Sequence, residues 1–274
     1  MALIWMDGKL RDAGEARVSV FDHGLTVGDG VFETVKSVDG RLFALTRHLD
    51  RLAVSARGLG LPEPDRDEVR RACLAVAEAN PVPLGRLRIT YTGGPSPLGS
   101  ARGDAGPTLV VALGEARRSP DTTSVITVPW VRNERGALSG LKTTSYAENV
   151  LALARARERG ASEALFGNTV GQLCEGTGSN VFVVLDGETH TPPLASGCLA
   201  GITRALVVEW TGARETELPL DVLERAEEIF LTSTLRDVQA VRAVDGRELP
   251  GAPGPVTAKA MRIFAERSAA DLDP

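Results

Sequence analysis

Short apolar runs joined by tight turns dominate the first part of the chain. Two aspartate-glycine dipeptides, Asp7-Gly8 and Asp39-Gly40, each lie between such runs. An aspartate-glycine pair in this setting is typical of a β-hairpin, because both residues accept the positive φ that a two-residue turn requires. The pattern therefore predicts two hairpins, with strands over 3–6 and 9–11 and over 31–38 and 41–44.

Apolar residues then recur at helical spacing. Thr46 is placed to cap a helix whose apolar face carries Leu49, Leu52 and Ala56, and Gly58 ends this helix. A second helix over 67–79 and strands over 86–92 and 108–113 complete this half of the chain.

The second half continues the mixture of short strands and helices. An alanine- and leucine-rich stretch over 146–159 predicts a helix that Gly160 ends. Further helices are expected over 202–210 and 256–267, strands over 124–129, 163–167, 170–174, 180–185 and 228–232, and a hairpin at Asp245-Gly246. Hairpins dominate, so the pattern predicts an α+β fold. We expect a small N-terminal domain over 1–114, a linker over 115–123 and a larger domain over 124–274.

Composition narrows the classes of function. The formal net charge of −5 and the lack of a basic run interleaved with aromatic residues argue against nucleic-acid and membrane-surface roles and favour a small-molecule partner. There is no signal-peptide core and no apolar run long enough to cross a bilayer, so we expect a cytoplasmic protein. The cysteines are odd in number and lack metal-ligand spacing, which argues against a disulfide framework or a metal site. They are Cys73, Cys174 and Cys198.

Primary amines are scarce in this chain, because the only lysines are Lys9, Lys36, Lys142 and Lys259. Lys142 lies between a glycine loop and a predicted helix, with no acid beside it in the sequence. Such a lysine is either a solvated loop residue or a nucleophile. A nucleophilic amine must be uncharged part of the time, which burial or a nearby positive centre can arrange.

Two glycine-rich segments carry further candidate chemistry. Glu175 is either a surface acid in a turn or, beside a pyridoxal ring, the acid that bonds the ring nitrogen and keeps it protonated. Gly201-Ile202-Thr203 opens a helix, and a helix N-terminus offers N–H donors and a positive dipole end to a phosphate. An ordinary helix cap is the alternative for this segment. Arg51 and the turn Thr232-Ser233-Thr234 are further phosphate candidates.

Taken in order, these segments resemble the fold-type IV, or class IV, pyridoxal-phosphate enzymes. That family includes branched-chain aminotransferases, D-amino-acid aminotransferases and aminodeoxychorismate lyases. The landmarks that carry the resemblance cover nearly the whole chain: Asp22-His23-Gly24 with 28–33, 47–52, 140–143, Glu175-Gly176 with Ser179-Asn180, Gly197 with 201–204, and 232–234. The resemblance implies the two-domain α+β fold of D-amino-acid aminotransferases, the cofactor pyridoxal 5'-phosphate (PLP) and a homodimer.

The resemblance also implies roles for single residues. Lys142 would hold the cofactor as an imine and then move a proton as a general base and acid. Glu175 would face the pyridine nitrogen. The residues implied at the phosphate are Arg51, Ile202, Thr203, Ser233 and Thr234, and the amides of Leu235 and Arg236 would receive a substrate carboxylate.

The region expected to contact substrate departs from the family pattern. The turn 91–94 lacks the arginine that D-amino-acid aminotransferases carry, and Val27 stands where many relatives have an aromatic residue. The charges near this turn include Arg88 and Arg102. Arg88 is our substrate candidate, together with Tyr146, which either lines the pocket or packs under the helix that follows it.

Three functions remain open at this point. The first is an aminotransferase that moves an amino group between an amino acid or amine and a 2-oxo acid. The second is an aminodeoxychorismate lyase that forms 4-aminobenzoate and pyruvate, and the lack of arginine in the turn 91–94 disfavours it. The third is a non-catalytic binding protein on the same fold, since a fold does not fix a function.

Overall fold

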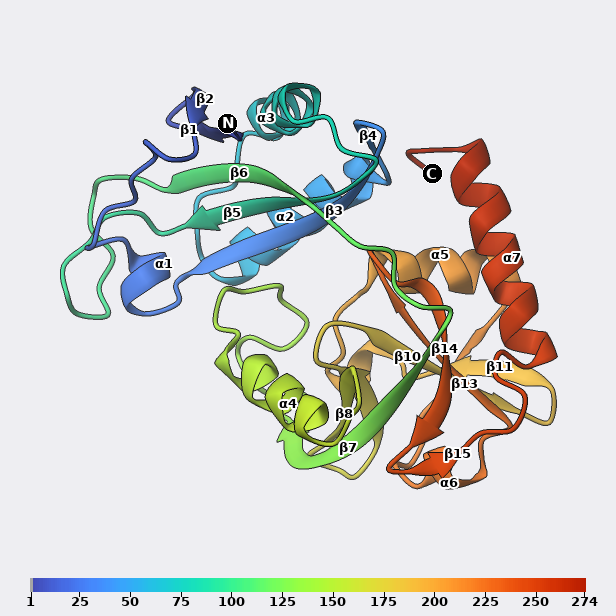
Figure 1. Ribbon diagram of the computed structural model, residues 1–274. Helices are drawn as coiled ribbons and strands as arrows, with labels where there is room; N and C mark the ends of the chain where they lie inside the picture. The colour runs from blue at the N-terminus through green and yellow to red at the C-terminus, as the bar shows by residue number, and fades with distance from the viewer. Residues whose placement is uncertain (1) are drawn as a thin grey trace. The chain divides into compact units, whose positions relative to one another are not determined.

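The computed structural model describes residues 2–274. The chain divides into two compact units, each with its own sheet and its own core (Figure 1). The first unit contains the chain up to Arg117 together with Leu141–Tyr146 and Asp271–Pro274. The second contains Arg118–Gly140 and Ala147–Ala270. Among the described residues, no helix is long and apolar enough to cross a membrane.

The first unit is built on a six-stranded sheet with the order β2-β1-β6-β5-β3-β4. Its strand pairs are antiparallel. Both predicted aspartate-glycine hairpins are confirmed, since β1 pairs with β2 and β3 pairs with β4. The strands are β1 (Leu3–Met6), β2 (Lys9–Asp12), β3 (Gly30–Val38), β4 (Arg41–Leu42), β5 (Leu84–Thr92) and β6 (Thr108–Glu115).

Helices α2 (Leu45–Gly58) and α3 (Arg66–Ala79) supply much of the apolar core of this unit, and α1 (His23–Thr26) is a single turn before β3. The apolar stripe of α2 packs with buried residues of β3 and β5, as the helical spacing of its leucines predicts. The core includes Val31, Val35, Leu49, Leu52, Val69, Val76, Leu87 and Ile89. This core includes residues of β3 and of α2, the helix that carries Arg51.

Helix α2 begins differently from the sequence prediction. Its N-cap is Ala44, in the left-handed conformation with a φ of 53° and with no side-chain cap, so the prediction that Thr46 is the cap is wrong. Thr46 lies in the first turn, where its N and Oγ1 donate to the two carboxylate oxygens of Asp273 at 2.8 and 2.5 Å. The acceptor for this helix end therefore comes from the other end of the chain, where no local sequence pattern reveals it.

The segment Leu141–Tyr146 belongs to the first unit. The sequence division placed it, with Lys142, in the larger C-terminal domain. The reason for the difference is backbone pairing: the amide of Phe32 donates to the carbonyl of Lys142 at 2.9 Å, and that of Thr144 donates to the carbonyl of Gly30 at 2.8 Å. The Thr144 hydroxyl also donates to the carbonyl of Gly28. These bonds tie the lysine to the start of β3.

The second unit is built on a nine-stranded mixed sheet with the order β12-β11-β10-β13-β14-β7-β8-β9, and β15 pairs with β14. Its strands are β7 (Thr122–Arg132), β8 (Glu163–Asn168), β9 (Leu173–Gly176), β10 (Asn180–Leu185), β11 (Glu188–Thr191), β12 (Arg214–Glu215), β13 (Glu228–Ser233), β14 (Asp237–Val244) and β15 (Arg247–Glu248). Its helices are α4 (Ala147–Glu158), the 3-10 turn η1 (Leu194–Ser196), α5 (Ile202–Thr211), α6 (Val222–Arg225) and α7 (Pro255–Ala270). Both units combine helices with sheets rich in antiparallel pairs, so the predicted α+β class is confirmed.

Candidate functional site

Lys142 lies beside an aromatic ring in the first unit. Its Nζ is 4.3 Å from the ring centroid of Phe32, a buried residue of β3. Tyr146 meets the same ring edge-on, with the two centroids 5.3 Å apart and the planes at 82°. Lys142 as a whole is partly buried.

Arg88 stacks on the same ring from β5. Its Cζ is 3.3 Å from the Phe32 centroid, and its Nε donates to the Thr90 hydroxyl at 3.3 Å. Burial lowers the pKa of Arg88 to about 10, because a buried cation loses solvation. Within residues 2–274 this guanidinium has no ion pair with a carboxylate. A carboxylate brought beside it would restore the electrostatic stabilisation that burial removes.

A buried carboxylate holds Arg51. Nε and Nη2 of Arg51 donate to Oε1 and Oε2 of Glu33 at 2.7 and 2.8 Å, and Nδ1 of His48 lies 2.7 Å from Oε2. Burial lowers the pKa of His48; the charge and hydrogen bond of Glu33 oppose this shift, and the positive charges of Arg51 and Lys142 add to it. Lys142 and Arg51 therefore share one electrostatic neighbourhood, centred on a histidine of α2.

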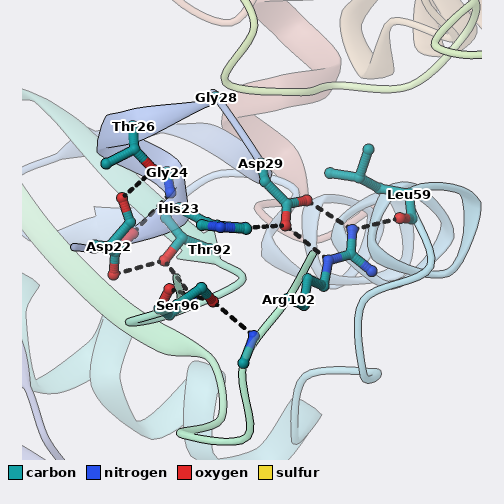
Figure 2. Close-up of polar contacts among 12 residues, drawn as sticks. Asp22, His23, Gly24, Thr26, Gly28, Asp29, Leu59, Thr92, Ser96 and Arg102 are labelled. Atoms are coloured by element: carbon teal, nitrogen blue, oxygen red, sulfur yellow. Dashed lines mark hydrogen bonds and ion pairs between the residues drawn. The ribbon is translucent and has the colours of Figure 1, made fainter. Parts of the chain in front are cut away.

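Arg102, a second arginine beyond the turn 91–94, is bound elsewhere (Figure 2). Its Nε and Nη2 donate to the two oxygens of Asp29 at 2.7 and 2.6 Å. Its guanidinium also donates to the carbonyls of Leu59 and Gly60 at 2.7 and 2.5 Å. Nδ1 of His23 lies 3.4 Å from Asp29. Arg102 thus joins its own loop to the Asp29 turn and to the end of α2.

In the second unit, Glu175 occupies β9 with both carboxylate oxygens engaged. The amide of Leu199 donates to Oε2 at 2.9 Å, and Nε of Arg132 lies 3.2 Å from Oε1. Arg132 also pairs with Glu148 at 2.6 Å, and its Cζ lies 4.0 Å from the ring centroid of Phe166, which is opposite Glu175 in the β8–β9 pair. Each carboxylate oxygen has two lone pairs, so these contacts leave acceptor capacity for a ring N–H.

The Leu199 segment leads directly into α5. Gly201 is the N-cap of this helix and provides no side-chain cap, so the first-turn N–H groups at Ile202 and Thr203 have no side-chain acceptor from it. A Cβ on Gly201 would collide with Oδ1 of Asn180, whose Nδ2 donates to the Leu199 carbonyl at 2.9 Å. Glycine is therefore required where the backbone approaches Asn180.

Thr232 lies in β13, one residue before the end of the strand. It pairs with Asn180 across the β10–β13 ladder, and Ser233 and Thr234 follow it. Its Oγ1 is buried and has no hydrogen-bond partner among residues 2–274. A buried hydroxyl without a partner costs free energy. A phosphate at the N-terminus of α5 would provide an acceptor, so the residues present fit a phosphorylated cofactor.

In the turn after β13, the side chain of Arg236 is held by other side chains of the second unit. Its guanidinium donates to the Ser162 hydroxyl and carbonyl, at 3.2 and 3.0 Å, and to Gln239. It also lies 3.7 Å from Glu163, a buried acid that accepts hydrogen bonds from Thr177 and Ser179. The Arg236 side chain therefore joins the segment before β8 to β14. Leu235 accepts a hydrogen bond from Ser119 at its carbonyl.

The candidates fall into two groups, one in each unit. The first unit holds Lys142, Arg51, Arg88 and Tyr146, and the second holds Glu175, Ile202, Thr203, Ser233, Thr234, Leu235 and Arg236. Sequence reasoning did not single out several residues that contact these candidates. Glu33 and His48 stood inside quoted motifs without an assigned role, while Arg132 had no local signal. Phe32 also stood inside a quoted motif, directly before Glu33, without an assigned role.

Comparisons with known proteins agree on one family. The family model described as amino-transferase class IV matches residues 30–244. The branched-chain-amino-acid aminotransferase of Pseudomonas aeruginosa is 30% identical, over 96% of this chain and 91% of that protein. A bifunctional aminodeoxychorismate lyase / D-amino acid transaminase of Mycobacterium tuberculosis is 31% identical, over 92% and 94% of the two chains. A solved structure from the same organism, a hypothetical aminotransferase in its PLP-bound form, is similar with a TM-score of 0.86 and 29% identity, over 98% and 100%.

Proposed function

Because the chain belongs to the class IV aminotransferase family, we propose that Lys142 is its catalytic residue and that PLP is its cofactor. The family depends on PLP, and the chain is an aminotransferase that moves an amino group between an amino acid or amine and a 2-oxo acid. The observation that carries the proposal is the position of Lys142, a partly buried residue whose Nζ lies 4.3 Å from the ring centroid of Phe32.

PLP, when bound, supplies an electron sink for the negative charge that develops at the α-carbon of the substrate. The residues of this chain have separate tasks. The Lys142 amine binds the cofactor and then carries the proton to and from the α-carbon. Glu175, fixed by the Leu199 amide and by Arg132, accepts a hydrogen bond from the ring nitrogen and favours its protonated form.

We assign the phosphate to the residues that the family resemblance implies. Ile202 and Thr203 contribute the N-terminus of α5, and Ser233 and Thr234 contribute the turn after Thr232, whose hydroxyl has no hydrogen-bond partner among residues 2–274. Arg51 adds a charge-assisted contact from α2. A helix N-terminus suits an anion because it offers backbone donors, and an arginine suits one because it carries a full positive charge.

Arg88 is proposed to bind a substrate carboxylate. It is a partly desolvated cation on the ring beside Lys142, and it has no ion pair with a carboxylate of the described chain. Tyr146, on the edge of the same ring, is proposed to shape the pocket. The amides of Leu235 and Arg236 remain candidates for a carboxylate, whereas the Arg236 side chain is engaged by Ser162 and Gln239.

A homodimer and a cytoplasmic location belong to the same proposal. The first unit exposes several large apolar side chains near α1, which suits a partner surface. They are Val18, Val20, Phe21, Leu25 and Val27, with exposed fractions of 48% to 69%. The location stays a prediction from the sequence.

The replacement Lys142→Ala tests the proposal. We expect the wild type to show the visible absorbance band of bound PLP, and the variant to lose that band and at least about 10³-fold of the transamination rate. The control is Lys259→Ala, which changes an exposed lysine of α7 and is expected to keep both signals. A Lys142→Ala enzyme that turns over at the wild-type rate would refute the assignment.

The lyase is the second candidate, because one relative is a bifunctional lyase and transaminase. An amino donor supplied without an acceptor separates the two reactions. An aminotransferase converts its cofactor stoichiometrically to the pyridoxamine form and stops. A lyase leaves the cofactor spectrum unchanged and releases pyruvate from aminodeoxychorismate.

A further inference from the structure

Glu33 lies at the centre of a small polar cluster inside the first unit. Its side chain is fully buried in β3, with an exposed fraction of 0%. Arg51 binds both of its oxygens in a bidentate arrangement, and Nδ1 of His48 approaches Oε2 at 2.7 Å. A buried carboxylate with three such contacts has its acceptor positions well satisfied.

The charges of this cluster are well defined. Burial favours the neutral form of Glu33, but the charge and hydrogen bonds of Arg51 outweigh it and hold the pKa of Glu33 well below its ordinary value. Burial lowers the pKa of His48, so its ring is neutral at neutral pH and Nδ1 donates as an N–H. The cluster therefore contains one anion, Glu33, and one cation, Arg51.

The pair has two opposite consequences for a phosphate bound by Arg51. The carboxylate neutralises Arg51, which weakens its attraction for a second anion. The bidentate contact also fixes the plane of the guanidinium, so that its geometry is set before a ligand binds. The carboxylate makes two of the contacts available to a group with five N–H donors, so gripping Arg51 does not by itself exhaust that group.

We propose that Glu33 is a positioning residue, which holds the guanidinium of Arg51 in the orientation that a phosphate requires. The proposal rests on the assignment of Arg51 to the cofactor phosphate. Orientation outweighs neutralisation because the grip comes from a rigid support: β3 is an interior strand between β5 and β4, and α2 is fixed by its apolar face. Glu33 needs no contact with the cofactor for this role.

The cluster also borders the reactive amine. The Lys142 charge acts on His48, and the carbonyl of Lys142 accepts the amide of Phe32, the residue before Glu33. A shift of Glu33 would therefore disturb two things at once: the support of Arg51 and the strand to which Lys142 is bound. This linkage requires a measurement that isolates phosphate recognition from catalysis.

Affinity for PLP relative to pyridoxal, which lacks the phosphate, provides that measurement. Dissociation constants for the two ligands are measured with the full chain stripped of cofactor, by equilibrium dialysis. For Glu33→Gln we expect PLP to bind at least about tenfold more weakly and pyridoxal to change by less than about twofold. Melting temperature and circular dichroism establish that the variant is folded.

Asp29→Asn is the matched control. Asp29 is also gripped by an arginine in a bidentate pair beside a histidine, in the same unit, but its partner Arg102 is bound to the loop carbonyls of Leu59 and Gly60. We expect its ratio of PLP to pyridoxal affinity to remain that of the wild type. Glu33→Asp serves as a second test variant, because it keeps the charge and withdraws the carboxylate by one methylene, and it should also lower the ratio.

The outcomes separate the proposal from the function on which it rests. A ratio in Glu33→Gln or Glu33→Asp that equals or exceeds the wild-type ratio overturns the positioning role, and a rise would mean that neutralisation dominates. If Arg51→Gln lowers the ratio while the Glu33 variants do not, Arg51 binds phosphate without help from Glu33. If the wild type itself does not prefer PLP to pyridoxal, the assignment of the phosphate site is wrong.

Discussion

Two clusters in the first unit share the same composition and differ in burial. Each consists of a histidine, a carboxylate and an arginine that grips both carboxylate oxygens. In the Glu33 cluster the carboxylate is 0% and Arg51 11% exposed, whereas in the Asp29 cluster the carboxylate is 13% and Arg102 34% exposed. Figure 2 shows the second cluster, in which Arg102 reaches the end of α2 as well as Asp29.

The difference teaches that contact geometry alone does not identify a role. An exposed ion pair is screened by water and salt and contributes little, so the Asp29 cluster acts mainly by joining loops. A buried pair cannot lose one member cheaply, because the remaining charge has no solvent to replace it. Burial thus makes the Glu33 cluster rigid, and rigidity is the property that a cofactor site requires.

The largest expected difference between the two clusters is the loss of unfolding free energy when the carboxylate of each is removed. Glu33→Ala leaves the Arg51 charge beside an empty buried space, and we expect a loss of about 3–5 kcal/mol in the free energy of unfolding. Asp29→Ala is expected to cost about 1 kcal/mol, since solvent reaches its partner. Urea unfolding of the two variants measures both numbers. Equal losses would show that burial does not distinguish the clusters.

The pH dependence of stability sharpens the comparison at His48. Burial lowers its pKa below the ordinary value of 6.5, so the unfolded chain takes up a proton at a higher pH than the folded chain does. Stability is therefore lost as the pH falls below 6.5, by up to about 1.4 kcal/mol for each pH unit until the folded state also binds the proton. In His48→Gln, the free energy of unfolding should lose this contribution to its pH dependence between pH 7.5 and 5.5, which is at most about 1.4 kcal/mol per pH unit for one proton.

Urea unfolding at several pH values provides the slopes. The wild type contains other groups that titrate in acid, so the informative quantity is the difference between the wild-type and His48→Gln curves. An unchanged difference across this interval would mean that His48 has the same pKa in the folded and the unfolded protein.

Salt gives the smallest expected effect. At about 1 M salt the Debye length is about 3 Å, so an exposed pair is largely screened while a buried pair is not. We expect the coupling energy between Asp29 and Arg102, from a double-mutant cycle, to fall by a few tenths of a kcal/mol at high salt. The coupling between Glu33 and Arg51 should remain. A salt-sensitive Glu33 pair would indicate that water reaches this cluster.

The fold was largely predictable because its signals are local. The strand over 180–185 and the helices near 67–79 and 202–210 follow from apolar spacing and from glycine and proline punctuation, and the structure contains β10, α3 and α5 there. Thr46 shows the limit. A threonine before an apolar helical face is typical of a cap, but the Asp273 carboxylate, 227 residues away, binds its amide instead.

In the candidate site too, local sequence signals identify some residues, whereas long-range contacts decide the partners of others. Lys142 and Glu175 could be proposed from residue type and order in the chain, and Gly201 from its place at a helix start. The amides of Leu235 and Arg236 stay predicted contacts for a substrate carboxylate, and the structure adds that the Arg236 guanidinium is bound to Ser162 and Gln239. Side-chain partners such as these come from segments that only the folded sheet brings together.

The sequence by itself determined the elements, the α+β class and the residue types that suit PLP chemistry, because turn dipeptides and apolar periodicity act between near neighbours. Only the tertiary structure decided that Lys142 packs on the start of β3, that Glu33 holds Arg51, and that Arg102 is tied to Asp29. These choices depend on desolvation and on the distance between charges, and both quantities exist only once distant segments have packed together.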